Sequence, residues 1–383
     1  MLADVTARHA VPAATLEEML DDIRRLVECE SPSADQGAVT RSADVVSSVG
    51  RGRLGTDPDR VVVNGCTHLR WRFGDKPARV LVLGHHDTVW PLGTLDRIPY
   101  GVRDGVLRGP GCFDMKTGLV QAFHAIAALG PLEGSADGVT LLITGDEEVG
   151  SPTSRALIER EATGCVASLV LEASGPGGAL KIGRKGVSTY QIKIVGRAAH
   201  AGLEPASGIN AAVALAQLIQ DVLALASPEH GTTVTPTLAR AGTTTNTIPA
   251  EGSLAVDARM WDAGEQQRVD HAIRALTPSL LGATLTVEGG PNRPPLQAGS
   301  SGDLTSLALQ VAAETGITQL STMSVGGASD GNFTAGVGVP TLDGLGAVGD
   351  GAHAAHEHVL VNHIVPRTTL LAALLRRLLQ GAG

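Results

Sequence analysis

The chain has 383 residues, of which 43% are hydrophobic, so it can bury a large core and is not predominantly disordered. Its formal net charge is −9, and it has no basic run long enough to follow a phosphate backbone, which argues against a nucleic acid partner. Aromatic residues make up only 2%, so stacked bases or an aromatic sugar platform are not expected to dominate recognition. The length predicts two or three domains, and no apolar stretch reaches the ~18 residues that span a bilayer.

The N-terminal region predicts a cytoplasmic protein with reduced cysteines. No basic start followed by an apolar segment indicates a secretory signal peptide, and residues 15–18 instead resemble a capping box that opens an amphipathic helix. The cysteines are scattered without paired spacing, which is usual for free thiols in a long chain of this kind. They are Cys29, Cys66, Cys112 and Cys165.

The next part of the chain predicts a parallel sheet. Strands are expected at about 79–83, 138–144 and 167–172, and they alternate with helical segments near 115–129 and 151–163. This is the βαβ pattern of a parallel sheet flanked by helices. Ligands of such sheets gather beyond the carboxyl ends of the strands, so functional side chains are expected there.

From about residue 183 the pattern changes to that of an inserted second domain. Its strands and helices are expected in the order βαββαβ, which is the split ferredoxin-like unit. The expected elements are strand 188–195, helix 208–225, strands 232–239 and 253–260, helix 265–276 and strand 284–288.

After Gly290 the earlier alternation of helices and strands resumes. It runs through a helix at 303–315 and an apolar run at 337–342 to a terminal helix at 364–379. The sequence therefore predicts an α/β fold with a discontinuous catalytic domain, 1–182 and 291–383, whose mostly parallel sheet is flanked by helices. Residues 183–290 form the inserted domain.

Two of the expected strands end in residues of the types that bind metals, namely histidine, aspartate and glutamate. The run 139–143 leads directly into three adjacent carboxylates, residues 146–148, whose mutual repulsion becomes tolerable when a cation neutralises the field. The run 79–83 leads in the same way into a Gly-His-His-Asp sequence that begins at Gly84. Taken alone, each pattern is more often a solvated turn or a helix start. Together, at one sheet edge, they predict a metallohydrolase.

Six short motifs extend this prediction along the chain, at 84–89, 111–116, 146–150, 171–172, 199–202 and 351–353. In order and spacing they resemble the cocatalytic dizinc peptidase and aminoacylase family, which includes glutamate carboxypeptidases, succinyl-diaminopimelate desuccinylases and N-acyl amino acid deacylases. The resemblance covers nearly the whole chain. Thr117 and Ala173 stand where many relatives have glycine and proline, and neither departure removes a ligand.

The resemblance implies a centre of two divalent metal ions per subunit. Zn²⁺ is the first candidate, and Co²⁺ or Mn²⁺ accept the same ligands. Two ions about 3.5–4 Å apart need a bridging carboxylate, and imidazole with carboxylate is an ordinary zinc set. His85 and Glu172 would bind one ion, Glu148 and His353 the other, and Asp114 would bridge both. His356 and His358 do not match the motif position and are interpreted as solvated.

The same resemblance implies the roles of three further residues. Asp87 would orient the ligating ring of His85, and Glu147 would be the general base. Zinc lowers the pKa of its bound water toward ~7, so hydroxide would attack an amide carbonyl and Glu147 would pass the proton to the leaving nitrogen. Family members supply the residue equivalent to His200 from the lid domain of the partner subunit, as an oxyanion donor. The inserted domain is therefore expected to be the lid and dimerisation domain of a homodimer, the alternative for His200 being a turn residue.

Substrate recognition is expected from Asn246, Arg259, Gly326 and Gly327, which resemble contacts in this family. It is also expected from Arg293, which stands where the chain would return from the inserted domain to the catalytic domain. A guanidinium suits bidentate carboxylate binding, although for each arginine a structural salt bridge is an equal alternative. We therefore predict hydrolysis of an amide next to a free carboxylate, of the glutamate carboxypeptidase or N-acyl amino acid deacylase type. Two alternatives stay open: a C–N hydrolase of a non-peptide carbamoyl or aryl amine substrate, and a non-catalytic metal-binding relative.

Overall fold

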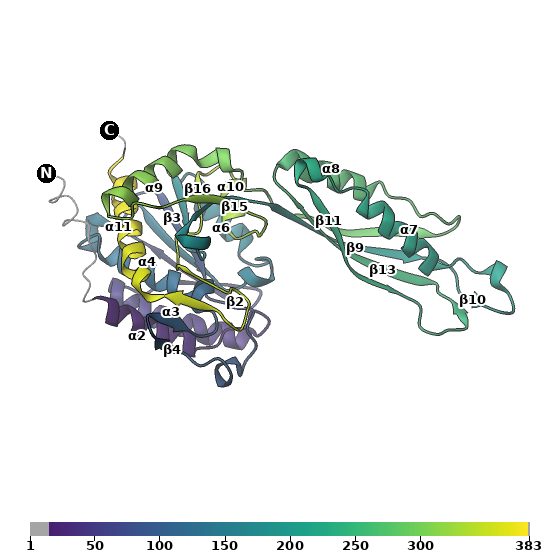
Figure 1. The fold of residues 1–383 in the computed structure, drawn as a ribbon, viewed down its shortest axis with the longest axis horizontal. Helices are drawn as coiled ribbons and strands as arrows, with labels where there is room; N and C mark the ends of the chain where they lie inside the picture. The colour runs from purple at the N-terminus through teal and green to yellow at the C-terminus, as the bar shows by residue number, and fades with distance from the viewer. Residues whose placement is uncertain (1–14, 382–383) are drawn as a thin grey trace. The chain divides into compact units, whose positions relative to one another are not determined.

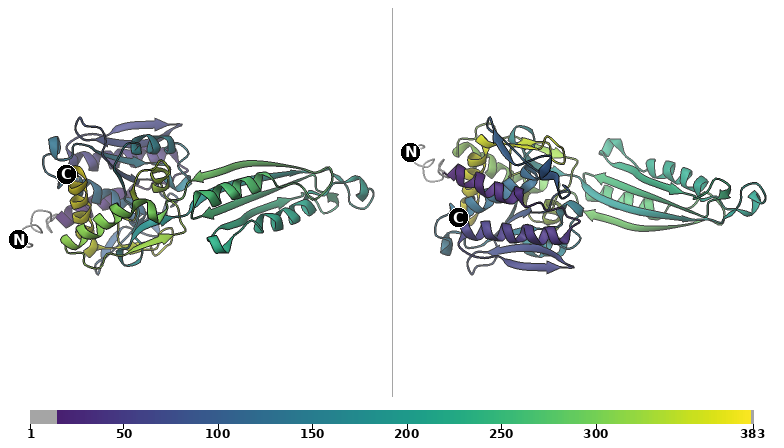
Figure 2. Two further views of the ribbon diagram at one scale, coloured as in Figure 1. Left: turned by 90° about the horizontal axis from the view of Figure 1, so that it is seen from above. Right: turned by 90° about the horizontal axis from the view of Figure 1, so that it is seen from below.

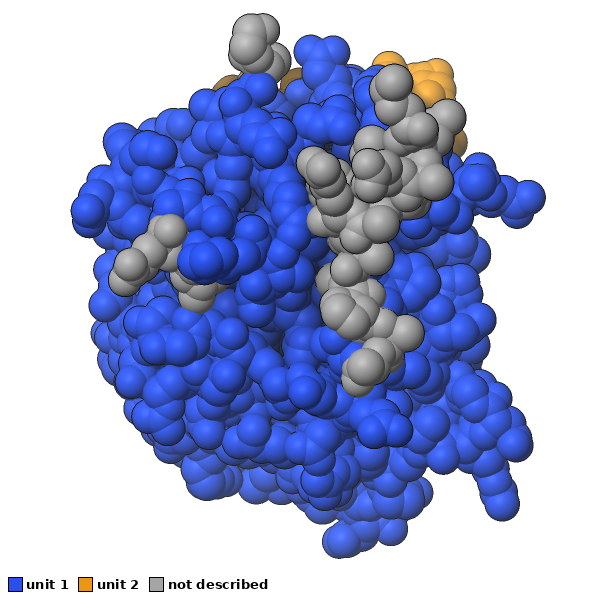
Figure 3. All heavy atoms as spheres, turned by 90° about the vertical axis from the view of Figure 1, so that its left-hand side faces the viewer, with its two compact units in different colours: residues 1–183, 298–325, 329–383 blue, residues 184–297, 326–328 orange. Residues whose placement is uncertain are grey.

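The structure, a computed structural model, describes residues 15–381 and divides into two compact units (Figure 1; Figure 3 colours them separately). Unit 1 comprises the chain up to Gly183, Ala298–Val325 and the chain from Ser329 onward. Unit 2 comprises Arg184–Gln297 and Gly326–Ala328. Among the described residues, no helix is both long and apolar enough to cross a membrane.

Unit 1 is built on a six-stranded, mostly parallel sheet. Its spatial order is β1-β2-β6-β3-β7-β16, in which β6, β3, β7 and β16 are parallel neighbours and β1 and β2 are antiparallel. The strands are β1 (Asp59–Val63), β2 (Cys66–Arg72), β3 (Val80–His85), β6 (Val139–Thr144), β7 (Ala167–Val170) and β16 (Thr341–Leu342). Strands β3, β6 and β7 are buried along their whole length, which explains their continuous apolar sequences.

Helices cover both faces of this sheet (Figures 1 and 2). Because side chains alternate along a strand, Val80 and Val82 of β3 belong to one core and Leu81 and Leu83 to another. The first core includes residues of α2 (Thr15–Glu28), α3 (Gln36–Leu54), α4 (Thr117–Ala127), α9 (Gly302–Glu314) and α11 (Ile364–Gln380). The second includes residues of α6 (Arg155–Ala162) and α10 (Gly331–Gly336). The helix α5 (Leu132–Ser135) precedes β6.

Short strands hold the loops of unit 1 together. A four-stranded sheet of order β17-β18-β5-β4 brings the segment around residue 353 beside residues 101–108. Its strands are β4 (Gly101–Arg103), β5 (Val106–Arg108), β17 (Gly349–Asp350) and β18 (His358–Leu360). Two further strands pair with each other, β8 (Leu180–Arg184) and β15 (Thr322–Val325). The expected strand at 337–342 is reduced to Thr341–Leu342, because Pro340 lacks an N–H and β16 pairs only with β7.

Unit 2 is an antiparallel sheet of order β11-β13-β9-β14 with two helices. Its elements follow the order βαββαβ along the chain: β9 (Gly186–Val195), α7 (Ala211–Leu223), β11 (Thr233–Ala241), β13 (Glu251–Met260), α8 (Ala263–Arg274) and β14 (Thr284–Arg293). Tyr190, Ile192 and Ile194 alternate along β9 into a core shared with both helices. The side chains of Asn210 and Asp262 cap the two helices. A short pair, β10 (Ala199–His200) and β12 (Thr247–Ile248), completes the unit.

Candidate metal centre

The carboxyl ends of three parallel strands bring metal-binding side chains to one edge of the sheet in unit 1. Strand β3 ends at His85, β6 leads into the turn that carries Glu147 and Glu148, and β7 leads into Glu172. Since β6, β3 and β7 are adjacent and parallel, their ends lie side by side. The local order of the strands therefore concentrates imidazole and carboxylate groups at this edge.

Two irregular segments complete the set. Asp114 lies in the segment Cys112–Lys116, with non-helical φ −117° and ψ 93°, directly before α4. Helix α4 approaches the end of β7 so closely that a Cβ at Gly118 would collide with the Leu171 carbonyl oxygen. His353 adopts φ +62° in the turn between β17 and β18. These backbone conformations bring both side chains to the strand ends.

The five side chains form two overlapping clusters that share Asp114. In the first cluster, His85 Nε2 lies 3.4 Å from Asp114 Oδ1 and 3.6 Å from Glu172 Oε1. In the second, His353 Nε2 lies 3.4 Å from Asp114 Oδ2 and 3.1 Å from Glu148 Oε2. Within each cluster the ligand atoms lie within 4.8 Å of one another. Asp114 thus presents one oxygen to each cluster, which is the position of a bridging carboxylate.

Unsatisfied polar atoms show that this donor set suits divalent metal ions. His85 Nε2, Asp114 Oδ1 and Glu148 Oε1 are buried and make no hydrogen bond. Buried polar atoms without a partner are costly and rare in native proteins. Imidazole nitrogens and carboxylate oxygens gathered in threes are the ligands that zinc and related ions take.

The charges in the clusters favour a bound cation. Contacts with Asp114 and Glu148 raise the pKa of His353 to about 10, although half of its side chain is exposed. Burial raises the pKa of the Glu148 carboxyl, and the nearby charge of Asp114 raises it further. Burial also opposes ionisation of Asp114, but the two histidines outweigh it and hold its pKa below the usual range. The centre therefore stabilises positive charge strongly.

Asp87 connects the two strand ends that carry His85 and Glu148. The Nδ1 of His85 donates to the backbone carbonyl of Asp87 at 3.0 Å, and the nearer carboxylate oxygen lies 3.4 Å away. That carboxylate also accepts the backbone N–H groups of Glu147 and Glu148, both at 3.2 Å, and the Ser33 hydroxyl at 2.6 Å. Asp87 therefore fixes the acidic turn as well as lying beside the histidine, which was not expected from the sequence.

The three adjacent acidic residues have different surroundings. Glu148 belongs to the second cluster, whereas Glu147 is buried and belongs to neither. Asp146 accepts hydrogen bonds from the Thr153 backbone and hydroxyl and from the Ser154 hydroxyl, at 2.5–2.7 Å, and so anchors the turn before α6. Asp146 is thus structural, Glu148 is a candidate metal ligand, and Glu147 is a buried carboxylate outside both clusters.

A third group of ligand-type residues, Cys66, His68 and Asp146, is already satisfied by the protein. His68 Nδ1 accepts the backbone N–H of Gly145 at 3.2 Å, and its Nε2 lies 3.0 Å from the Thr153 hydroxyl. That hydroxyl in turn donates to Asp146. Burial raises the pKa of the Cys66 thiol to about 12, so it stays protonated. We call this group the threonine-linked cluster, and its polar contacts are those of a structural network.

The predicted residues of unit 2 have partners of their own within that unit. His200 is exposed, and its Nδ1 accepts the N–H groups of Gly202 and Leu203, both at 3.1 Å. The backbone of Asn246 accepts the N–H of Ala201, so these two predicted residues lie on neighbouring segments. All of these hydrogen bonds lie within unit 2.

The predicted arginines and glycines of unit 2 also have defined surroundings. Arg259 pairs with Asp257 at 2.9 Å and donates to the Gly326 carbonyl at 3.2 Å. Arg184, which was not expected from the sequence, is buried and donates to the Gly327 carbonyl at 3.1 Å. Arg293 ends β14, where it pairs with Val187 of β9. The Gly326-Gly327 loop is therefore held by hydrogen bonds from the guanidinium groups of Arg259 and Arg184.

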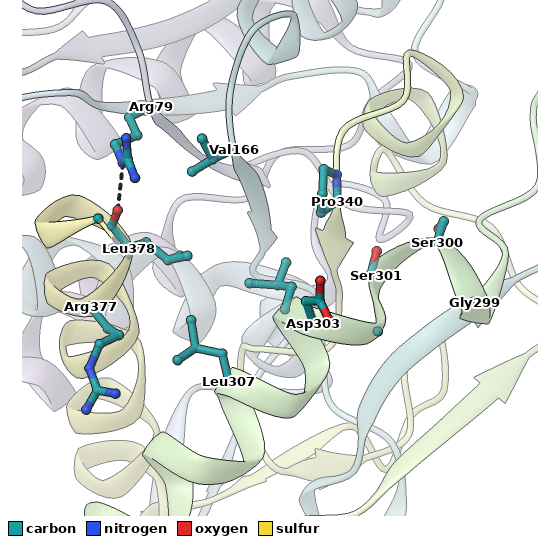
Figure 4. Close-up of a pocket in the computed structure, with 13 residues that line it drawn as sticks. Arg79, Val166, Gly299, Ser300, Ser301, Asp303, Leu307, Pro340, Arg377 and Leu378 are labelled. Atoms are coloured by element: carbon teal, nitrogen blue, oxygen red, sulfur yellow. Dashed lines mark hydrogen bonds between the residues drawn. The ribbon is translucent and has the colours of Figure 1, made fainter. Parts of the chain in front are cut away.

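A pocket of about 730 Å³ lies at the opposite edge of the sheet in unit 1 (Figure 4). Arg79, Val166 and Pro340, which line it, directly precede β3, β7 and β16, so they mark where these parallel strands begin. Arg79 Nε donates to the Leu378 carbonyl at 2.7 Å, and Arg377 pairs with Glu314 at 2.8 Å. Within the described residues, its lining includes none of the predicted site residues.

The fold and the paired clusters together define a metal-dependent hydrolase. Residues 81–377 match the model of Peptidase family M20/M25/M40, and the chain belongs to this family. The chain is 30% identical over 302 residues to carboxypeptidase G2 of Pseudomonas sp. (strain RS-16), covering 77% of this chain and 72% of that protein. The family expected from the motifs is therefore confirmed, and the protein is a metal-dependent enzyme that hydrolyses amide bonds.

Two further comparisons extend over nearly the whole chain. The chain is 31% identical over 381 residues to succinyl-diaminopimelate desuccinylase of Roseobacter denitrificans (strain ATCC 33942 / OCh 114), covering 91% of this chain and 96% of that protein. The fold is similar to that of aminopeptidase PepT from Bacillus cereus ATCC 10987, with a TM-score of 0.75, 21% identity and coverage of 95% and 99%. The second likeness supports the mixed α/β fold alone.

Proposed function

We propose that the protein hydrolyses an amide whose amine side is an α-amino acid with a free carboxylate. The observation that carries this proposal is the pair of clusters that share Asp114, with Glu147 buried beside them but outside both. Relatives named carboxypeptidase G2 and succinyl-diaminopimelate desuccinylase support an amide next to a carboxylate. Only 2% of the residues are aromatic, which favours a simple N-acyl amino acid or short peptide over a substrate with a stacked ring.

Two divalent ions per subunit, with Zn²⁺ as the first candidate, fit the two clusters. His85, Asp114 and Glu172 would hold one ion, and Asp114, Glu148 and His353 the other. When bound, such ions supply an activated water and a Lewis acid that polarises a carbonyl. The unsatisfied atoms of His85, Asp114 and Glu148 support this assignment.

Glu147 is the proposed general base. The residue is only 7% exposed, so its carboxylate acts in a site with little bulk water. Its backbone is fixed through the hydrogen bond from its N–H to Asp87. A base held in this way accepts a proton from the attacking water and delivers it to the leaving nitrogen.

His200 is the proposed donor to the substrate oxyanion. Since its Nδ1 accepts two backbone N–H groups, the neutral ring carries its proton on Nε2 and can donate it. By the family resemblance this ring acts from the partner subunit of a cytoplasmic homodimer. The proposal includes residues 183–290 as the lid and dimerisation domain, and 1–182 and 291–383 as the catalytic domain. The compact units differ from these predicted bounds, since unit 2 extends to Gln297 and includes Gly326–Ala328.

Asn246, Arg259, Arg293 and the Gly326-Gly327 loop are the proposed contacts of the substrate carboxylate. Arg259 already pairs with Asp257, so substrate binding through it would have to compete with that ion pair. Arg293 ends β14, where the chain would return from the inserted domain to the catalytic domain, and it is the first arginine to test. A planar guanidinium can bind a carboxylate through two parallel hydrogen bonds.

The test of the substrate class compares an N-acyl amino acid or dipeptide with its C-terminal amide, which lacks the charge. The amide is expected to lose ~1.5–3 kcal/mol in kcat/KM, the range for hydrogen bonds to charged groups. Arg293→Ala should remove most of that preference. Equal kcat/KM for acid and amide would contradict carboxylate recognition, and would favour a C–N hydrolase of carbamoyl or aryl amine compounds.

The shared site is tested by mixing two inactive variants. His200→Ala and Glu147→Gln subunits are expected to regain activity in mixed dimers, because one of the two sites then holds both intact groups. Unmixed variants refolded in the same way are the control. Sedimentation of a fully active monomer would contradict the shared site.

A further inference from the structure

Glu357 is a buried carboxylate whose acceptor capacity is fully used by the loops of the metal centre. Its Oε1 accepts the backbone N–H groups of Phe113 and Asp114, at 2.9 and 3.1 Å. Its Oε2 accepts the backbone N–H of Gly111 at 2.9 Å and the indole N–H of Trp90 at 2.7 Å. A carboxylate has about four acceptor sites, so these four donors occupy all of them. Glu357 is 0% exposed and has no lone pair left for a metal ion.

The four hydrogen bonds join three segments that carry proposed ligands. Trp90 follows β3, which ends at His85, and the donors at 111–114 form the turn that presents Asp114. Glu357 itself lies four residues after His353, in the same turn between β17 and β18. The backbone of that turn is tight, since a Cβ at Gly351 would lie 2.9 Å from the Cα of Glu357.

We propose that Glu357 is a positioning residue of the metal centre. It fixes the bridging ligand Asp114 against the terminal ligand His353, and it acts through the backbone of both loops without touching the ions. The inference rests on the metal assignment of the proposed function. It follows that loss of Glu357 should weaken binding of the ion held by Asp114, Glu148 and His353 more than it lowers the stability of the fold.

The carboxylate cannot be replaced by its isosteric amide at this position. In Glu357→Gln, one of the two oxygens becomes an NH₂ group, which presents hydrogens to two N–H donors whichever way the amide turns. Either the pair at Phe113 and Asp114 or the pair at Gly111 and Trp90 then loses its acceptor. The side-chain volume is nearly unchanged, so the variant alters the hydrogen bonds and the charge at this position but not its packing.

The experiment measures metal binding by the apo protein. Wild type and Glu357→Gln are stripped with a chelator, checked for folding by circular dichroism, and titrated with Co²⁺ while visible absorption is recorded. We expect at least one of the two Co²⁺ binding steps to lose about 10- to 100-fold in affinity in Glu357→Gln, the range for residues that orient metal ligands. The absorption spectrum of the doubly loaded protein should change as well.

Glu161→Gln is the matched control. Glu161 is another buried glutamate of unit 1, and it accepts hydrogen bonds from Arg70 and Arg72 away from the ligand loops. This variant should lower the melting temperature but leave both Co²⁺ affinities and the spectrum as in wild type. If Glu161→Gln weakened Co²⁺ binding as much as Glu357→Gln, the effect would be one of general stability and the inference would fail.

The outcomes separate the inference from the proposed function. Wild type that binds fewer than two ions would overturn the metal assignment. Wild type with two ions and Glu357→Gln with the same affinities and spectrum would overturn the role of Glu357 alone. If Glu357→Gln does not fold, Trp90→Phe decides, because it removes one donor and leaves the carboxylate. A smaller loss in the same binding step supports the inference, and wild-type binding refutes it.

Discussion

Unit 1 holds two groups of ligand-type side chains that differ in one respect, namely whether the protein itself supplies their hydrogen bonds. The threonine-linked cluster contains a thiol, an imidazole and a carboxylate, but Thr153 and backbone N–H groups occupy its polar atoms. The clusters around Asp114 contain buried nitrogen and oxygen atoms that make no hydrogen bond. The types of residue are similar, so unfilled acceptor capacity, rather than composition, identifies the metal site.

The largest expected effect separates chemistry from metal binding within the acidic turn. Glu147→Gln should lower kcat by at least ~10²-fold, because loss of a general base typically has this effect. Its metal content should stay at the wild-type level, since Glu147 belongs to neither cluster. Glu148→Gln, the neighbouring control, should instead lose metal. If Glu147→Gln lost metal but kept its rate per bound ion, Glu147 would be the metal ligand and Glu148 the general base.

The second expected effect is the metal count of the two groups. After dialysis, elemental analysis should find two divalent ions per chain in the wild type and in Cys66→Ala, because the threonine-linked cluster contributes none. His85→Ala should hold fewer, since it lacks a ligand of the first cluster. A third ion in the wild type that is absent from Cys66→Ala would show that the threonine-linked cluster binds metal, and would contradict the distinction drawn between the two groups. Full activity with one bound ion would contradict a centre of two ions.

The smallest expected effect concerns another network that the protein satisfies, at Asp22. Burial raises the pKa of this carboxyl, but hydrogen bonds from His124 and Arg53, at 3.0 and 2.7 Å, outweigh burial and hold the pKa below the ordinary 3.8. A lowered pKa stabilises the fold above the unfolded value, and this contribution is lost as the pH falls through the folded value.

Asp22→Asn should therefore reduce the free energy of unfolding at pH 7 by about 1.5–3 kcal/mol, the range for hydrogen bonds to charged groups. The difference from wild type should shrink below about pH 4, where Asp22 of the unfolded chain begins to take up a proton, and should fall further as the pH passes the lower pKa of the folded state. Denaturant unfolding at several pH values measures it. A constant difference from pH 7 to pH 3 would show that ionisation of Asp22 is not responsible. At pH 7 the metal content of Asp22→Asn should equal that of the wild type.

Sequence patterns predicted the strand ends and the family, because apolar runs and polar motifs are local. The β1–β2 hairpin was not predicted, although Asn64 and Gly65, with φ of 49° and 85°, are a strong hairpin signal between its strands. The short strands β17 and β18 were also missed. They pair with each other over only two residues each, and β18 pairs further with β5, some 250 residues earlier, which no local pattern records.

The positions of the candidate ligands were easier to predict than their supports. His85, Asp114 and Glu148 stand in motifs that can be compared residue by residue. Glu357 stands between two histidines, and its four donors come from residues more than 240 positions earlier. The second role of Asp87 was missed for the same reason, because hydrogen bonds to the backbone of residues 147–148 leave no mark on side-chain identity.

The alternation of β3 between two cores also decides which of two adjacent histidines can bind a metal. His85 faces Asp114 and Glu172, whereas His86 contacts the Ser42 hydroxyl at 3.1 Å and the Thr67 carbonyl at 3.1 Å. If β3 slipped by one residue, Leu81 and Leu83 would exchange cores with Val80 and Val82, and His86 would take the place of His85. Packing on both faces of the sheet thus fixes which residues of β3 point to each face, and in this way it determines that His85, and not His86, is the candidate metal ligand.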